Sequence, residues 1–241
     1  MPRIYVDVEL IPGAECELPP AAAHHVRDVL RLGIHAELVL FNGRGGEYSA
    51  RLLAATRAGA RALVEAHHLG MVESPLTLTL VQSISRGERM DYTLQKAVEL
   101  GVNHIVPVVS RRTVVRLDTT REEKRLEHWC GVVRHATEQC GRAMLPTIAA
   151  VVPLASWLAG PRPSRCYLLD PRAPTSLAAA PDPPYEVAIV AGPEGGFDPQ
   201  ERADLLAAGV VGVRLGPRIL RTETAALTAL TVLQTRWGDL A

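Results

Sequence analysis

The sequence lacks the features that mark membrane-spanning and secreted proteins. No apolar run approaches the ~20 residues needed to span a bilayer. Residues 1–11 carry acidic side chains where a signal peptide needs an apolar stretch. The cysteines are few and far apart, and none belongs to a CxxC pair: Cys16, Cys130, Cys140 and Cys166. We therefore expect a cytoplasmic protein with reduced thiols and no membrane partner.

The chain also lacks a net charge, because its 26 Lys and Arg residues balance its 26 Asp and Glu residues. This balance argues against a polyelectrolyte that coats nucleic acid, but it leaves room for a local basic site. The excess of basic over acidic side chains lies in residues 75–150. The 19 Gly and 18 Pro residues are scattered, which excludes a collagen-like chain.

Several well-known catalytic signatures are absent as well. The sequence has no GxGxxG, Walker A, GxSxG or HExxH motif, which disfavours dinucleotide, nucleoside triphosphate, serine-hydrolase and zinc-protease chemistry. Six of the eight histidines form adjacent pairs or lie seven apart on a predicted helix without a carboxylate at zinc-ligand spacing: His24, His25, His67, His68, His128 and His135. We expect no metal ion.

The first third of the chain has the pattern of short strands with one helix. Alternation of Ile4, Val6 and Val8 predicts a strand over residues 3–9. A helix is predicted over 21–31, with Val26, Val29 and Leu30 on one face. Further strands are predicted over 37–41, 47–54 and 60–67. So many short strands favour a small β-barrel domain over residues 1–73.

After Ser74-Pro75 the pattern changes to strands that alternate with helices. Compact apolar runs predict strands over 76–82, 104–109, 166–170, 187–191 and 210–215. Amphipathic periodicity and capping signals predict helices over 88–100, 120–140, from 199 onward and over 222–237. This alternation predicts an α/β domain with a parallel sheet over residues 74–241.

Two glycine-containing loops each join a strand to a helix. The first, residues 191–196, ends before a helix that the capping box from Asp198 to Glu201 opens. The second, residues 215–225, places Arg218, Arg221 and Glu223 near a helix start, with Thr222 as the expected N-cap. A tight turn and a capped helix start would explain each loop separately. Because ligands of α/β sheets bind at the carboxyl ends of strands, the two loops together point to a shared pocket.

At these loops the sequence resembles a known family. GPEGGFDPQE (192–201) and LGPRILRTETAAL (215–227) are similar to the RsmE family, the SPOUT-class methyltransferases of uridine N3 in small-subunit ribosomal RNA. Three further stretches agree, in order along the chain: 24–48, 95–115 and EQCGRAMLPTI at 138–148. One departure is Arg86-Gly87-Glu88, where the family pattern has Lys-Gly-Asp.

The resemblance implies a PUA-like RNA-binding barrel followed by a SPOUT domain with a C-terminal trefoil knot. It implies S-adenosylmethionine as cofactor, 16S rRNA in the 30S subunit as substrate, and a homodimer with the active site at the subunit junction. Carried over by position, cofactor binding falls on Leu168, Leu169, Gly192, Glu194, Gly195, Gly196, Leu215, Gly216, Ile219, Leu220 and Ala225.

Methylation of uracil at N3 requires removal of the N3 proton. Glu223 or Glu194 is a candidate base, and Arg221 a candidate to stabilise negative charge on a uracil carbonyl oxygen. The sequence leaves the choice of base open, and we take Arg221 and Glu223 as the candidate catalytic pair. A target base must be unpaired or flipped out. The candidate phosphate contacts, for each of which an ordinary solvated arginine is an equal alternative, are Arg86, Arg111, Arg112 and Arg142.

Three other functions fit parts of the sequence. The nearest is a SPOUT enzyme that acts on transfer RNA, and the RNA that accepts a methyl group distinguishes it. A non-catalytic RNA-binding or assembly factor would bind RNA without affinity for the cofactor. An NAD-dependent enzyme is disfavoured by the missing fingerprint and acidic ribose partner.

Overall fold

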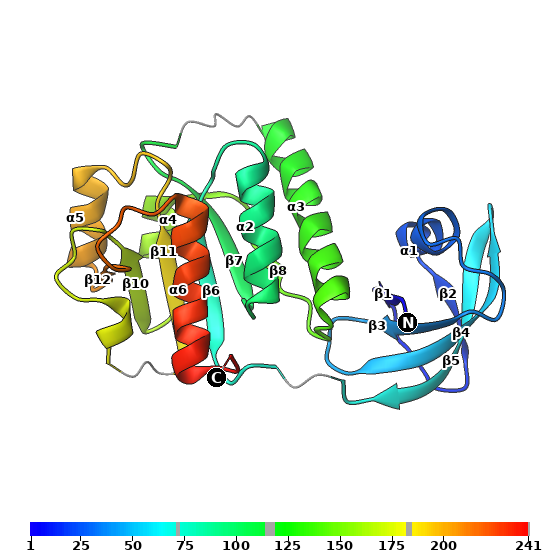
Figure 1. Ribbon diagram of the computed structural model, residues 1–241. Helices are drawn as coiled ribbons and strands as arrows, with labels where there is room; N and C mark the ends of the chain where they lie inside the picture. Colours follow the sequence, from blue (N-terminus) through cyan, green and yellow to red (C-terminus); the bar gives the residue numbers. More distant parts are fainter. Residues whose placement is uncertain (71–72, 114–118, 182–184, 241) are drawn as a thin grey trace. The chain divides into compact units, whose positions relative to one another are not determined.

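The computed structural model describes residues 1–70, 73–113, 119–181 and 185–240. These residues form two compact units, which are treated separately (Figure 1). The first unit comprises Met1–Glu73 and Thr137–Leu145. The second comprises Ser74–Ala136 and Pro146–Ala241.

The first unit is built on a five-stranded sheet. Its strands pair in the order β1-β3-β4-β5-β2, and all neighbours are antiparallel except β1 and β3. We predicted a small β-barrel, and among the described residues its strand pairing is an open path with β1 and β2 at its ends. The bounds are β1 Arg3–Tyr5, β2 Glu15–Leu18, β3 Glu37–Phe41, β4 Glu47–Thr56 and β5 Gly59–His68.

The helix predicted over residues 21–31 is shorter and less regular. The α-helix α1 (Pro20–His24) continues as one π-helical turn, η1 (His25–Val29), in which the Leu30 amide donates to the His25 carbonyl. A π turn holds more residues than an α turn and therefore shifts the apolar periodicity. Val26 is buried as predicted, whereas Val29 and Leu30 are exposed, which corrects the predicted apolar face.

A segment distant in sequence completes the first unit. Helix α3 (Thr119–Cys140) ends in it, and residues 137–145, which the sequence analysis assigned to the second domain, pack there. The Glu138 carboxylate accepts from the Tyr5 amide at 2.9 Å, and the Leu145 amide donates to the Gly43 carbonyl at 3.3 Å. Nothing local in the sequence signals these contacts, because they depend on packing over a long chain separation.

The second unit contains the predicted parallel sheet, and every pair of neighbouring strands in it is parallel. The strand order is β12-β10-β11-β6-β7-β8, and β9 also pairs with β7. The bounds are β6 Thr77–Ser83, β7 His104–Val109, β8 Thr147–Ile148, β9 Val152–Pro153, β10 Arg165–Leu169, β11 Glu186–Ala191 and β12 Val211–Val213.

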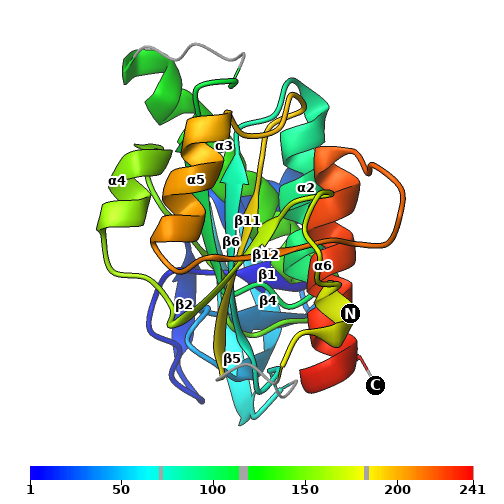
Figure 2. The ribbon, with the colours of Figure 1, turned by 90° about the vertical axis from the view of Figure 1, so that its left-hand side faces the viewer.

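Helices cover both faces of this sheet. Figure 2 shows α2 (Glu88–Glu99) and α6 (Thr222–Trp237) on one face, and α4 (Leu154–Ala159) and α5 (Pro199–Ala207) on the other. A 3-10 turn, η2 (Leu177–Ala179), follows β10. The predicted capping box of α5 is present. The Asp198 side chain accepts from backbone amides of the first turn, and the Glu201 side chain accepts from the Asp198 amide.

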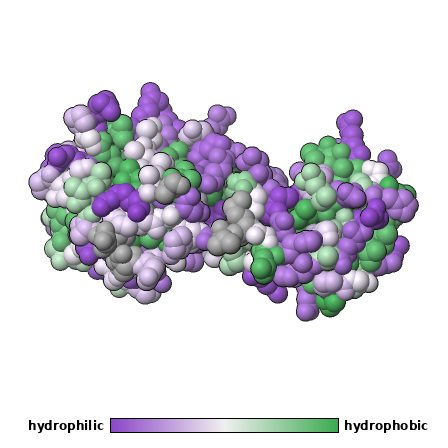
Figure 3. Space-filling model, turned by 60° about the horizontal axis from the view of Figure 1, so that its bottom comes forward, coloured by the Kyte–Doolittle hydropathy of each residue, from purple (hydrophilic) through white to green (hydrophobic). Residues whose placement is uncertain are grey.

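The surface mixes apolar and polar side chains. Figure 3 shows hydrophobic and hydrophilic groups interspersed on the visible face of each unit. Within the described ranges, no helix combines the length and the apolar character that a bilayer span requires.

Candidate functional site

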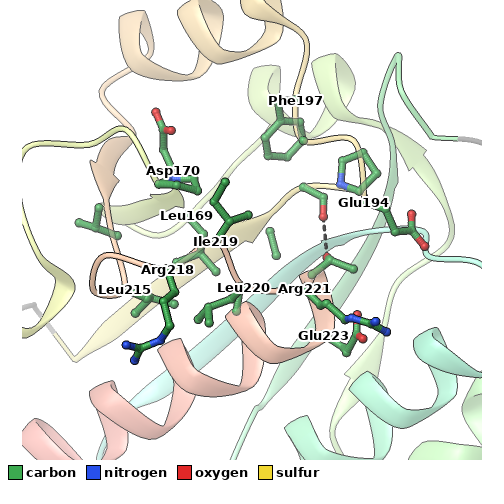
Figure 4. A pocket seen from close by; sticks show the side chains of 18 of the residues that line it. Leu169, Asp170, Glu194, Phe197, Leu215, Arg218, Ile219, Leu220, Arg221 and Glu223 are labelled. Atoms are coloured by element: carbon green, nitrogen blue, oxygen red, sulfur yellow. Dashed lines mark hydrogen bonds between the residues drawn. The ribbon is translucent and has the colours of Figure 1, made fainter.

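The two glycine-containing loops meet at one cavity, as the sequence analysis expected. The cavity has a volume of about 380 Å³ and lies at the carboxyl ends of β10, β11 and β12, where α/β sheets bind ligands (Figure 4). The end of β11 and the loop after it supply Ala191 to Phe197 except Gly195. The loop after β12 and the first turn of α6 supply Leu215 and Arg218 to Glu223.

Most of the predicted cofactor residues line this cavity. The lining includes Leu169, Gly192, Glu194, Gly196, Leu215, Ile219, Leu220 and Ala225. Leu168, Gly195 and Gly216 are not part of it. Leu168 points from the same strand into the core packed against α4 and α5, because neighbouring residues of a strand face opposite sides of the sheet.

The cavity wall is largely apolar. Leu169, Val213, Leu215 and Leu220 contribute aliphatic side chains, and Ile219 is 85% exposed. A large aliphatic side chain so open to solvent beside an apolar cavity is suited to cover a bound ligand. Phe197 adds an aromatic face to the lining, and the sequence analysis missed it although it directly follows the glycine-rich loop.

Asp170 is a second lining residue that the sequence analysis missed. Its carboxylate is buried at the end of β10 and accepts hydrogen bonds from the Arg172 amide at 2.9 Å and from the Arg202 guanidinium of α5. Burial raises the pKa of Asp170, but the hydrogen bonds from Arg172 and Arg202 outweigh burial, so the pKa lies below its ordinary value. The group is therefore an anion that joins β10 to α5 beside the cavity.

We predict that Asp170→Asn lowers the free energy of unfolding by about 1.5–3 kcal/mol at pH 7, the range for hydrogen bonds to a charged group. Because the folded-state pKa is the lower one, this stabilisation is complete above the ordinary carboxyl pKa and is lost as pH falls through the folded value. Urea unfolding of both proteins between pH 7 and pH 3 tests this. A difference between the two proteins that does not shrink with falling pH would contradict it.

Glu194 connects the loop after β11 to the start of α2. Its carboxylate accepts from the Arg86 amide at 3.2 Å and from the Arg89 guanidinium at 3.1 Å. Burial raises the pKa of Glu194, but its backbone hydrogen bonds and Arg89 together lower it below the ordinary value. A carboxylate held in this way is a weak proton acceptor, which disfavours Glu194 as the base.

The start of α6 differs by one residue from the prediction. Arg221 occupies the N-cap position and makes no side-chain capping bond, whereas Thr222, the expected N-cap, is the first helical residue. The Thr222 hydroxyl donates instead to the Gly192 carbonyl at 2.6 Å, the dashed line in Figure 4. This bond joins the two loops of the cavity directly.

Arg221 and Glu223 reach the same end of the cavity. In Figure 4 their side chains lie together, whereas the Arg218 guanidinium points away at the opposite end. Arg221 is exposed, and its guanidinium makes no hydrogen bond or ion pair with the residues that the structure describes. The Glu223 Oε2 atom is buried and accepts no hydrogen bond from the same set of residues. Both groups are therefore available to a ligand.

The four arginines predicted to contact RNA have different surroundings. Arg86 and Arg112 lie beside the loop after β11, and the Arg112 guanidinium donates to the Gly195 carbonyl at 3.0 Å. Arg111 pairs with Asp198 at 3.3 Å. Arg142 is buried in the first unit and forms an ion pair with Glu73 at 2.7 Å, so its guanidinium has a partner within that unit and is not at the surface.

No cluster of three or more His, Cys, Asp or Glu side chains in the described ranges could hold a metal ion. The polar groups that line the cavity are a mixture of arginines, carboxylates and a hydroxyl.

Comparison with known proteins identifies the family. The family model described as an RNA methyltransferase domain matches residues 72–234, and the one described as an RNA methyltransferase PUA domain matches residues 18–65. Among curated proteins, ribosomal RNA small subunit methyltransferase E of Mycobacterium bovis is 33% identical, with 98% of this chain and 94% of that protein covered. The protein of the same name from Buchnera aphidicola is 31% identical, and the match covers 100% of this chain and 98% of that protein.

Solved structures agree with these matches. The crystal structure of ribosomal RNA small subunit methyltransferase E from Neisseria gonorrhoeae bound to S-adenosyl methionine is 40% identical, covers 100% of both chains and has a TM-score of 0.95. The structure of a methyltransferase of Legionella pneumophila in complex with SAM is 38% identical. It covers 99% of this chain and 98% of that chain, also with a TM-score of 0.95. The chain therefore belongs to the ribosomal RNA small subunit methyltransferase E family.

Proposed function

We propose that this protein uses S-adenosylmethionine to methylate N3 of one uridine in 16S rRNA of the small ribosomal subunit, the uridine conventionally numbered 1498. The observation that carries the proposal is the cavity itself. Both segments that resemble the family, residues 192–201 and 215–227, contribute to its lining. The relatives crystallised with S-adenosylmethionine cover essentially the whole of this chain.

The residues of the cavity fit this cofactor. Adenine is uncharged and flat, so apolar walls such as those of Leu169, Leu215 and Leu220 suit it, together with backbone donors and acceptors. Gly192 and Gly196 let the backbone approach a ligand closely. When bound, S-adenosylmethionine supplies an electrophilic methyl group on a sulfonium.

Arg221 and Glu223 are then left for the uridine. The exposed guanidinium of Arg221 would donate to a uracil carbonyl oxygen and stabilise the negative charge that develops when N3 loses its proton. The buried Glu223 Oε2 atom, which lacks a donor among the described residues, would accept that proton. Between the two carboxylates, Glu223 is favoured because Arg86 and Arg89 already occupy the Glu194 carboxylate.

RNA would contact both units. In the second unit, Arg86, Arg111 and Arg112 are exposed near the loop after β11 and can bind phosphates, whereas buried Arg142 is left out of this set. We assign residues 1–73 as a PUA-like RNA-binding domain and 74–241 as the SPOUT methyltransferase domain, with 137–145 added to the first unit by packing. Such an enzyme acts where ribosomal subunits are, in the cytoplasm.

Two further features of the family are proposed for this chain. One is a homodimer through α2 and α6, where half-exposed Tyr92 lines a groove together with Thr224, Leu227, Thr228, Thr231 and Val232. The other is a C-terminal trefoil knot around residues 171–180. The Arg214 guanidinium donates to the Ala173 carbonyl and the Arg236 guanidinium of α6 donates to the Ala180 carbonyl, so this loop is bonded to the segment after β12 and to α6, which supports the proposal.

The test is methyl transfer from labelled S-adenosylmethionine to 30S subunits from a strain that lacks the modification, followed by mass mapping of the product. We expect label at N3 of one 16S uridine. Label in transfer RNA alone would favour the related transfer RNA enzymes. Binding of RNA without cofactor affinity in calorimetry would favour a non-catalytic factor.

A further inference from the structure

A buried chain of hydrogen bonds links three segments at the cavity. The Gln82 Nε2 atom donates to the Thr222 hydroxyl at 3.0 Å, and that hydroxyl donates to the Gly192 carbonyl at 2.6 Å. Gln82 lies near the end of β6, Gly192 directly follows β11, and Thr222 opens α6. The three residues are far apart in sequence and reach one another only in the folded unit.

Sheet register explains how these groups meet. Gln82 is paired with Ala191 across the parallel strands β6 and β11, so Gly192 lies just beyond the level of Gln82. Gln82 is 0% exposed and Thr222 is 8% exposed. Water therefore has little access to the bond between Gln82 and Thr222, and a partner lost there is poorly replaced by solvent.

The direction of each bond follows from the donors available. The second Nε2 proton of Gln82 goes to the Ser83 carbonyl at 2.9 Å, so both amide protons are used. The Oε1 atom is buried and has no donor among the described residues. The reverse amide orientation would place Oε1 against the Ser83 carbonyl, which is why the Thr222 hydroxyl accepts from Gln82 and gives its own proton to Gly192.

We propose that Gln82 and Thr222 are positioning residues for methyl transfer. They fix the loop after β11 relative to the first turn of α6. This inference rests on the proposed function, in which that loop holds the cofactor while Arg221 and Glu223, on either side of Thr222, hold the uridine. The chain of hydrogen bonds would thus set the alignment of the two reactants rather than the affinity for either one.

The test compares Thr222→Val, which keeps the shape and removes the hydroxyl, with Thr222→Ser, which keeps the hydroxyl. Gln82→Met removes the donor at nearly constant volume. Thr93→Val is the matched control, because the buried Thr93 hydroxyl bonds the Arg89 carbonyl within α2 and takes no part in the chain from Gln82 to Gly192. For each variant we would measure the melting temperature, the cofactor dissociation constant, and the single-turnover rate at saturating cofactor and 30S subunits.

We expect Thr222→Val and Gln82→Met to lower the saturated rate by about 10–100-fold, the effect of a small misplacement of reactants. Thr222→Ser should stay near wild type, and Thr93→Val should lose stability but keep the saturated rate. If Thr222→Val fails to fold, Gln82→Met decides the outcome.

An unchanged saturated rate in both Thr222→Val and Gln82→Met would overturn the proposal, whether or not stability or cofactor affinity falls. A wild-type protein that transfers no methyl group to any RNA would instead refute the proposed function. The two failures are therefore distinguishable.

Discussion

Replacing Arg221 by alanine is expected to lower turnover by about 100–1000-fold, the usual effect of removing one preorganised donor, while cofactor affinity stays near wild type. Arg221 is exposed at the N-cap of α6, and its guanidinium makes no hydrogen bond or ion pair within the described part of the chain, so truncation of the side chain removes no internal hydrogen bond or ion pair. Negative charge near a helix N-terminus is favoured, and a uracil anion would benefit there from both the helix and the guanidinium. Steady-state kinetics on 30S subunits with parallel calorimetry of cofactor binding measure both quantities.

The control for Arg221→Ala is Arg221→Lys, which retains the charge but loses the planar pair of donors. We expect intermediate turnover from it, and melting temperatures near wild type for both variants. Loss of cofactor binding in Arg221→Ala, with turnover at saturation unchanged, would show that Arg221 belongs to the cofactor pocket instead.

The second large effect is expected from Gly192→Val, which should weaken cofactor binding about 100-fold. A Cβ atom at Gly192 would lie 3.3 Å from two ring atoms of Phe197, and a branched side chain would also occupy the cavity that Gly192 lines. Overpacking typically costs about 1–3 kcal/mol, and 1.4 kcal/mol corresponds to a tenfold change in affinity. Calorimetric titration with S-adenosylmethionine measures the loss directly.

Gly195→Ala is the matched comparison for Gly192→Val. A Cβ atom at Gly195 would meet the Arg112 side chain no closer than 3.7 Å, an ordinary contact, and Gly195 is outside the cavity lining. We expect its affinity to stay close to wild type. Equal losses in the two variants would mean that the loop as a whole, rather than the space beside Phe197, determines binding.

The parts of the fold that depend on local patterns were predictable. The alternation of apolar runs with amphipathic helices gave the parallel sheet, and the capping box located the start of α5 at Pro199. The shared cavity followed from a general rule, because two loops at the carboxyl ends of strands in one sheet meet at the same edge.

The features that depend on distant partners were not predictable in this way. Thr222 has the residue type of an N-cap, but the Gly192 carbonyl takes its hydroxyl, and Gly192 is brought there by strand pairing. Asp170 had no visible partner in sequence, since Arg202 reaches it from α5. Arg142 was predicted to be a surface cation, because its ion pair with Glu73, 69 residues away in the sequence, forms only in the folded unit.

The segment 137–145 has a consequence for the order of folding during synthesis. The ribosome releases residues 1–73 long before Glu138 and Leu145, which bond the Tyr5 amide and the Gly43 carbonyl. Domains made first generally fold first, but here the first unit must wait for a stretch that emerges after β6, α2 and β7 of the second. The two units therefore cannot be completed strictly one after the other, because all five strands of the N-terminal sheet have been made by His68, whereas the first unit stays incomplete until Leu145 has been made.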